Sequence, residues 1–235
     1  MIPFMPELPE VEVARQSFAS FIDGAVVREV VLGAPLRWPL GCAPAALRGA
    51  RVGAATRRGK YLWLPLMQAT HPQAGVLLHL GMSGSLAFGP AHQLPPRGKH
   101  DHFELHTSQG VLRLTDPRRF GAVVWSASQE AAPASTLLSK LGAEPFDETF
   151  TAQHFHAALQ RRRVAVKSAL LGGDIVVGAG NIYACEILYR AGISPFRQAA
   201  TLSEREWKAI FRQARRILKK GIEKYLSVYR SPKLS

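Results

Sequence analysis

The chain has 235 residues, 47% of them hydrophobic, and carries a formal net charge of +13 with a pI near 10.3. This length allows one large hydrophobic core or two smaller ones, and the composition excludes a disordered low-complexity protein. The charge is typical of a protein that binds a polyanion, and nucleic acid is the first candidate. A membrane surface is the weaker alternative, because no apolar run is long enough to span a bilayer and no signal-peptide layout is present. We therefore expect no membrane partner and a cytoplasmic location.

Only two cysteines are present, Cys42 and Cys185. Two cysteines cannot build a four-cysteine zinc site or a disulfide framework. We interpret both as small buried hydrophobic residues.

Residues 5–12, Met-Pro-Glu-Leu-Pro-Glu-Val-Glu, place a proline directly after a methionine and before a carboxylate. Removal of Met5 would make Pro6 the amino terminus, and its secondary amine could attack an electrophilic carbon without a cofactor. With residues 1–4 retained, the same nitrogen is an amide and is not a nucleophile. The structural alternative is that Pro6 and Pro9 begin a helix, with the neighbouring glutamates near its positive end.

The first half of the chain is rich in short segments of Val, Leu and aromatic residues separated by turn residues. This pattern predicts β-strands. The predicted strand segments are residues 25–32, 60–66, 75–88, 102–106, 111–115 and 121–125. Residues 108–110, Ser-Gln-Gly, predict a hairpin turn between two of them.

After a Ser, Ala and Pro-containing stretch at residues 126–135, the pattern becomes helical, with helices predicted over residues 151–159 and 164–171. The clearest helix begins at Ser203, which forms a predicted capping box with Glu206. One face of that helix is apolar. Between residues 205 and 224 there are eight Lys or Arg against two Glu, so the other face is either solvated or in contact with phosphate.

Three internal motifs suggest nucleic-acid chemistry. Residues 178–184, Gly-Ala-Gly-Asn-Ile-Tyr-Ala, lead small residues into a helix whose free backbone N–H groups could cradle a phosphate, with Asn181 as a further donor. The alternative is an ordinary glycine turn before a helix.

The second motif, residues 116–121, presents two arginines and Phe120 on a tight loop, and the third, residues 79–85, carries Met82 on a turn between strand-like runs. An inserted ring, an arginine and a methionine could fill the gap left when a base is swung out of a duplex. The alternatives are that Phe120 packs inward and that Met82 fills the core.

Together these motifs resemble the bacterial formamidopyrimidine-DNA glycosylases, bifunctional repair enzymes for oxidised purines. The resemblance extends from Pro6 to about Lys224 and keeps the motifs in order. Leu8 favours this family over its relative endonuclease VIII, which typically has glycine there. The segments that carry it are residues 6–10, 57–62, 79–86, 99–102, 115–121 and 180–184.

The resemblance implies an α+β multidomain fold, with an N-terminal helix and a two-layer β-sandwich followed by an all-α helix-two-turn-helix domain. We expect a catalytic β-sandwich domain over residues 6–127 and a linker over 128–150. A helix-two-turn-helix domain is expected over 151–226, and a short tail over 227–235.

The resemblance also implies a DNA glycosylase with AP lyase activity, which excises 8-oxoguanine and formamidopyrimidines from damaged double-stranded DNA. Pro6 would attack C1′ of the nucleotide and Glu7 would assist opening of the sugar ring as acid or base. Successive β and δ eliminations would then cut the backbone. Lys60 resembles the family lysine of the β domain that helps to bind the lesion strand.

Other positions match the family's DNA-binding residues. Three of them fill the void left by the flipped base: Met82, Arg118 and Phe120. Arg119 lies in the same loop, and three further residues match phosphate-contacting positions: His100, Lys167 and Asn181. Glu10 matches a position that we interpret as structural support.

The sequence departs from the family pattern at both ends. It stops at Ser235 without the family's four-cysteine zinc finger, so we expect no metal and no cofactor, and four residues precede Met5. Three hypotheses follow: an active glycosylase and lyase that starts at Pro6, a catalytically impaired DNA-binding remnant, and a generic basic RNA-binding protein. The family also suggests a monomer associated with the bacterial nucleoid.

Overall fold

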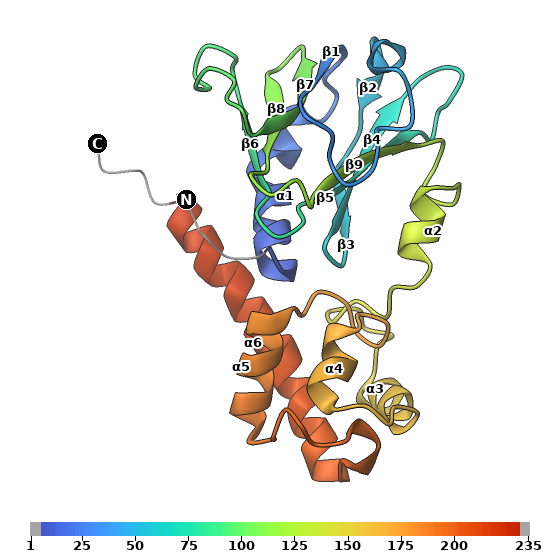
Figure 1. Ribbon diagram of the computed structural model, residues 1–235, viewed down its shortest axis with the longest axis vertical. Coiled ribbons are helices and arrows are strands. Elements are labelled where there is room, and N and C mark those ends of the chain that lie inside the picture. Colours follow the sequence, from blue (N-terminus) through green and yellow to red (C-terminus); the bar gives the residue numbers. More distant parts are fainter. Residues whose placement is uncertain (1–5, 231–235) are drawn as a thin grey trace. The chain divides into compact units, whose positions relative to one another are not determined.

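The computed structural model describes residues 6–230, which divide into two compact units. The β unit consists of Pro6 and Val11–Ser139, and the helical unit consists of Glu7–Glu10 and residues 140–230. Helix α1 (Leu8–Ile22) therefore begins in the helical unit and continues into the β unit. The predicted α+β multidomain class is confirmed (Figure 1).

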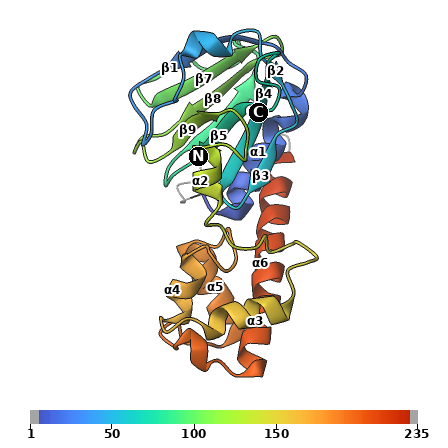
Figure 2. The same cartoon turned by 90° about the vertical axis from the view of Figure 1, so that its right-hand side faces the viewer.

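The β unit contains two antiparallel sheets (Figures 1 and 2). One has the strand order β1-β7-β8-β6 and the other β2-β4-β5-β9, with β3 paired to β4. The strands are β1 (Val27–Leu32), β2 (Arg51–Val52), β3 (Thr56–Arg58), β4 (Tyr61–Met67), β5 (Gly75–His79), β6 (Ser85–Gly89), β7 (Asp101–Thr107), β8 (Val111–Thr115) and β9 (Ala122–Ser126). A short 3-10 helix, η1 (Pro44–Leu47), lies between β1 and β2 in the chain.

The alternation of side chains along the strands builds the core of this unit. Leu62 and Leu64 of β4 are buried in one cluster with Phe103 of β7, so the two sheets enclose the main core. Trp63, between the two leucines, points to the opposite face of its sheet. There it packs with Leu77 in a smaller cluster that includes Ala134 of α2 (Ala134–Leu138). The second sheet is therefore covered on both faces.

The predicted strand over residues 75–88 is two strands. Residues 80–84 form the turn between β5 and β6. Gly81 has a φ of +61°, and a Cβ built on it would lie 2.5 Å from the Gly121 nitrogen. A left-handed backbone and this close approach both require glycine, and they end the strand at that point.

The helical unit contains four main helices around its own hydrophobic core. They are α3 (Ala152–Gln160), α4 (Val166–Leu171), α5 (Asn181–Ala191) and α6 (Glu204–Arg230), with a 3-10 turn η2 (Ala199–Thr201) before α6. The predicted apolar face of α6 is confirmed, because Trp207, Ile210 and Leu218 are buried in this core. Gly192 ends α5 with a φ of +70°, in the usual left-handed C-cap conformation.

The start of α6 differs in one detail from a complete capping box. The Glu206 carboxylate accepts a hydrogen bond from the Ser203 N–H at 2.7 Å, as predicted. The Ser203 hydroxyl, however, donates to the same carboxylate at 2.9 Å. Among residues 6–230 this hydroxyl accepts no hydrogen bond from the Glu206 N–H, which a complete box requires.

The unit boundaries also differ from the predicted domains. Helix α2 lies inside the predicted linker and packs on the β unit, while Phe150, at the end of that linker, is buried in the helical core. Helix α6 continues through Arg230, beyond the predicted boundary at 226. The stretch before Pro232 contains no helix-breaking residue after Gly221, and proline disfavours helix in the residue before it.

Candidate catalytic and DNA-binding site

In the β unit, a buried aspartate joins the two loops that carry the predicted void-filling residues. The Asp116 carboxylate is fully buried and accepts hydrogen bonds from the Ser83 hydroxyl at 2.5 Å and from the Gly121 N–H at 2.7 Å. It also accepts from the Arg118 N–H at 3.2 Å. Because ionised acceptors make stronger hydrogen bonds than neutral ones, this carboxylate holds the Met82 loop against the Phe120 loop.

The same loops expose apolar side chains. Met82 is 39% exposed and Phe120 is 44% exposed, so neither is a core residue and the inward-packing alternatives are wrong. The Arg118 guanidinium lies over the Phe120 ring at 4.9 Å, a cation–π arrangement. Arg119 is exposed and has a φ of +56°, a left-handed conformation that is uncommon outside glycine. The structure therefore brings Met82, Arg118 and Phe120 onto neighbouring loops with accessible side chains.

Lys60 follows Gly59 in the turn between β3 and β4, and its charge acts on His79. Burial, followed by the charges of Lys60 and Arg37, lowers the pKa of His79 to about 4. His79 is thus neutral at neutral pH, and its Nδ1 accepts a hydrogen bond from the Gly81 N–H at 3.1 Å. The ring of Tyr61 lies 4.7 Å from the His79 ring. Lys60 therefore stands beside the base of the Met82 loop.

His100 is connected to the same loops through the main chain. Its carbonyl accepts a hydrogen bond from the Asp116 N–H at 2.9 Å. The His100 ring contacts the buried His102 ring edge-on, with 6.4 Å between centroids. Lys60, Met82, His100, Arg118, Arg119 and Phe120 therefore all lie on the turns and loops around β4, β5 and β8.

In the helical unit, Glu7 occupies the amino-terminal end of α5. Its carboxylate is fully buried and accepts hydrogen bonds from the backbone N–H groups of Gly180, of Ile182 at 2.9 Å and of Tyr183 at 3.3 Å. A negative charge is stabilised there by the unsatisfied N–H groups and by the helix dipole. Glu7 is peptide-linked to Pro6, so this contact determines where the peptide after the proposed nucleophile lies.

This contact corrects the predicted phosphate cradle. The N–H groups expected to be free for a phosphate are bonded to Glu7 instead. Asn181, the first residue of α5, is exposed, and its side chain stays accessible to a ligand. Lys167 lies in the first turn of α4, where its N–H donates to the Pro195 carbonyl at 3.3 Å.

Glu10 and Tyr183 complete the arrangement around Glu7. One Glu10 oxygen accepts from the Glu7 N–H at 3.0 Å, and the other accepts from the Tyr183 hydroxyl at 3.2 Å. Burial, followed by the negative charge of Glu10, raises the pKa of Tyr183, so its hydroxyl stays protonated and remains a donor. The side chain of Leu8 is also buried in the helical core.

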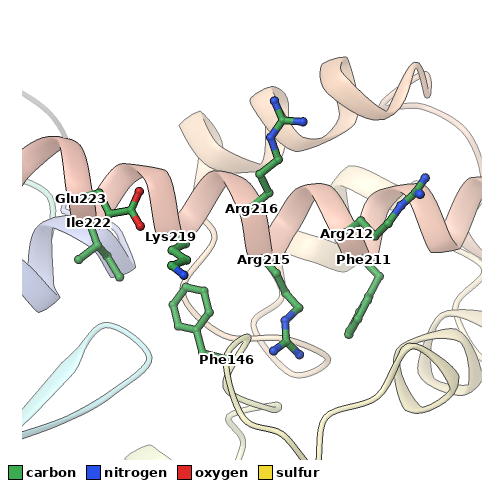
Figure 3. A pocket seen from close by; sticks show the side chains of 8 residues that line it. All are labelled: Phe146, Phe211, Arg212, Arg215, Arg216, Lys219, Ile222 and Glu223. Carbon is green, nitrogen blue, oxygen red and sulfur yellow. The ribbon is translucent and has the colours of Figure 1, made fainter.

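The basic face of α6 borders a groove of about 740 Å³ (Figure 3). Phe146 approaches the helix on the side toward which Arg215 and Lys219 point, whereas Arg216 points away from it. Among the described residues, no carboxylate lies within ion-pair distance of Arg212, Arg215, Arg216 or Lys219. The charges are thus available to an anionic ligand.

Two observations concern metals and membranes. Within residues 6–230 no group of three or more His, Cys, Asp or Glu side chains is arranged to hold a metal ion. No helix in this part of the chain is long and apolar enough to cross a membrane.

Sequence reasoning did not single out Asp116, Ser83 or Tyr183, although all three hold predicted site residues in place. An aspartate before proline at the start of a tight loop was a usable signal, because aspartate side chains accept hydrogen bonds from nearby backbone N–H groups. Tyr183 had no comparable signal, since its partner Glu10 is far away in the sequence.

Comparison with known proteins identifies the family. Residues 5–123 match the formamidopyrimidine-DNA glycosylase N-terminal domain, and residues 141–231 match the formamidopyrimidine-DNA glycosylase H2TH domain. The formamidopyrimidine-DNA glycosylase of Acidovorax sp. (strain JS42) is 52% identical over 94% of this chain and 79% of its own length. The protein of the same name from Albidiferax ferrireducens is 58% identical over 85% of this chain and 71% of its own.

Solved structures agree. The Lactococcus lactis Fpg (MutM) in complex with DNA containing N7-benzyl-Fapy-dG has a TM-score of 0.83 and 30% identity, covering 93% of this chain and 79% of that one. The MutM (Fpg) protein of Thermus thermophilus has a TM-score of 0.79 and 34% identity, covering 93% and 76%. The chain belongs to the formamidopyrimidine-DNA glycosylase family. Neither the DNA-binding remnant nor the RNA-binding alternative is favoured by these matches.

Proposed function

We propose that this chain is a DNA glycosylase with AP lyase activity that excises oxidised purines, 8-oxoguanine and formamidopyrimidines, from double-stranded DNA. Membership of the family across both units is the single observation that carries the proposal. Related solved structures are complexes with DNA that contains N7-benzyl-Fapy-dG and with DNA that contains carbocyclic 8-oxo-G, which supports the substrate class.

The proposed chemistry begins with the Pro6 nitrogen as a free secondary amine. Its lone pair forms a bond to C1′ of the damaged nucleotide while the bond from C1′ to the base breaks, and the base leaves with a proton. Glu7 assists opening of the sugar ring, and the resulting iminium makes the adjacent C–H bond acidic, so the 3′ and then the 5′ phosphate is eliminated. These steps use an amine and carboxyl groups, and we propose that they need no metal or cofactor.

The loops of the β unit are proposed to hold the opened duplex. Met82, Arg118 and Phe120 would occupy the gap left by the extruded nucleotide, because an apolar wedge and a stacked ring replace lost base stacking. Lys60, His100, Arg119, Lys167 and Asn181 would contact the sugar–phosphate backbone. Glu10 would support the amino-terminal turn. We further propose that the protein acts as a monomer on the bacterial nucleoid.

Borohydride trapping tests the nucleophile. Two forms are compared: one translated from Met5, which should lose that methionine and start at Pro6, and one that keeps residues 1–5, with both amino termini verified by intact mass. On a duplex with 8-oxoguanine, the Pro6 form should give a covalent adduct and the extended form should not, because an imine requires a free amine. At neutral pH a useful fraction of a terminal amine with a pKa of about 7.7–8.0 is unprotonated.

Absence of an adduct with the verified Pro6 form would refute the enzyme proposal.

Phosphate contact is tested separately by the salt dependence of duplex binding. If about six cations neutralise phosphates, the logarithm of the binding constant should fall with the logarithm of salt concentration with a slope of about −5. A slope near zero would refute duplex binding.

A further inference from the structure

Glu7 and Glu10 are held by a single residue of α5, Tyr183, at two different points. The Tyr183 N–H donates to the Glu7 carboxylate at 3.3 Å, and the Tyr183 hydroxyl donates to the Glu10 carboxylate at 3.2 Å. Glu10 in turn accepts the Glu7 N–H at 3.0 Å. The contacts form a closed set in which the main-chain N–H of Tyr183 holds Glu7, just before α1, and its side-chain hydroxyl holds Glu10 in the first turn of α1.

The nitrogen at the centre of this set belongs to the peptide bond between Pro6 and Glu7. A peptide unit is planar, so fixing the Glu7 N–H fixes the Pro6 carbonyl as well and leaves only the rotation next to the Pro6 ring. Glu10 can hold that N–H in one direction only if its own carboxylate is held. Among the described residues, the Tyr183 hydroxyl is the group that bonds the other Glu10 oxygen.

The surroundings of the hydroxyl leave it little freedom. Tyr183 is 8% exposed, and a Cβ built on Gly221 of α6 would lie 2.6 Å from its oxygen and 2.9 Å from the Pro9 ring. The glycine thus lets α6 approach the hydroxyl closely. With its pKa raised by burial and by Glu10, the hydroxyl donates throughout the neutral range.

We propose that Tyr183 is a positioning residue for the amino-terminal nucleophile, because its hydroxyl holds Glu10 and thereby fixes the Pro6–Glu7 peptide. The inference rests on the proposed function of Pro6. Tyr183 itself touches neither substrate nor reacting atoms in this scheme. Its effect is on the rate of attack at C1′ rather than on the affinity for DNA.

The test uses the complete chain in its Pro6-start form with Tyr183→Phe, and Tyr189→Phe as the matched control. Tyr189 lies on the same helix but is 78% exposed, so its hydroxyl makes no comparable buried contact. Single-turnover excision of 8-oxoguanine should slow about tenfold or more in Tyr183→Phe, since small displacements of a reacting group cost large factors in rate. Affinity for a duplex with a non-cleavable abasic analogue should stay within about twofold, and the control should match the parent in both.

Two more measurements separate positioning from loss of folding. Glu10→Gln should slow the reaction to a similar degree, and the double variant should be no slower than the slower single variant, because residues of one network are not additive. Hydrogen exchange at the Glu7 amide should be faster in Tyr183→Phe than in the parent or in Tyr189→Phe. This last readout needs no activity, so it reports on the contact even if the parent forms no adduct.

An unchanged rate or unchanged Glu7 exchange in Tyr183→Phe would overturn the inference, as would equal losses in both tyrosine variants. A parent without an adduct but with the expected change in Glu7 exchange would leave the contact established and would refute the proposed function instead.

Discussion

Each of the two units contains a fully buried carboxylate whose hydrogen bonds hold candidate site residues, but the two differ in reach. In the β unit, Asp116 bonds the Arg118 and Gly121 N–H groups of its own loop and the Ser83 hydroxyl of a neighbouring loop. In the helical unit, Glu7 bonds N–H groups at the start of α5, more than 170 residues away in sequence. Asp116 organises two loops of its own unit, whereas Glu7 attaches the amino-terminal turn to a helix that is distant in sequence.

The difference shows how one kind of interaction serves two purposes. Asp116 fixes the backbone of the two loops on which Met82 and Phe120 are exposed. Glu7 neutralises a helix end that would otherwise attract an anion from solution. Substituting each carboxylate in turn should therefore show that Asp116 organises the loops of the β unit and that Glu7 attaches the amino-terminal turn to α5.

Glu7→Gln should have the largest effect. The amide would present N–H donors to the N–H groups of α5, which need an acceptor, so the amino-terminal turn loses its strongest attachment. Excision and adduct formation in the Pro6-start form should fall about 100-fold or more, because acid–base assistance contributes 10²–10⁴-fold. Single-turnover kinetics measure this, with Glu206→Gln at the start of α6 as the control. Activity within a few-fold of the parent would contradict the role of Glu7.

The next largest effect is expected in the pH dependence of the stability of the β unit. The folded pKa of His79 is about 4, against 6.5 for the free side chain, because burial and then Lys60 and Arg37 disfavour the charged ring. The unfolded chain thus binds more protons between these values. The stabilisation from neutral His79 is complete above pH 6.5 and is lost as the pH falls toward 4, by about 3 kcal/mol at 1.36 kcal/mol per unit.

Urea unfolding between pH 4 and 7 measures this loss, and hydrogen exchange locates it in the β unit. His79→Gln serves as the control, since its amide oxygen can accept the Gly81 N–H but does not titrate. The variant should show a shallower dependence on pH. An equal slope in parent and variant would show that other groups govern the acid response.

Sequence patterns predicted much of the fold because the relevant signals are local. The short apolar segment of β4 between turn residues and the apolar face of α6 are both readable without knowledge of the partner surface. Helix α2 was missed since its five residues resemble a Ser- and Pro-containing linker, and only Trp63 and Leu77 on a sheet face make it buried. The predicted linker included Phe150 for the same reason: its burial in the helical core depends on residues that are distant in sequence.

The site was less predictable from sequence than the fold. The sequence left open whether Phe120 and Met82 are exposed, because the answer depends on the Ser83–Asp116 hydrogen bond between two loops. It gave no sign that Glu7 would occupy the start of α5, and so the N–H groups there were assigned to phosphate. Long-range pairing of a charge with a helix end leaves no periodic trace in either segment.

Asp116→Asn should have a smaller effect than Glu7→Gln on activity but a clear one on stability. One oxygen remains to accept, while the amide nitrogen would face either the Gly121 N–H or the Arg118 N–H. Losing hydrogen bonds to a charged group costs about 1.5–3 kcal/mol. Urea unfolding should show a loss of this size, and Ser83→Ala should show a smaller one. Equal losses in the two variants would mean that the hydroxyl, rather than the charge, organises the loops.

Met82→Ala and Phe120→Ala should give the smallest changes, and these should appear in DNA binding alone. Both side chains are substantially exposed, so the free energy of unfolding should change by no more than about 0.5 kcal/mol. Affinity for a duplex with an abasic analogue should fall about tenfold for each, since a ring or wedge that replaces base stacking contributes about 1–3 kcal/mol. Fluorescence of 2-aminopurine beside the lesion measures the unfilled gap directly. If the free energy of unfolding fell as much as the free energy of binding, the two side chains would be part of the packing of their loops. It would then be wrong that Asp116 organises the loops while Met82 and Phe120 serve DNA binding alone.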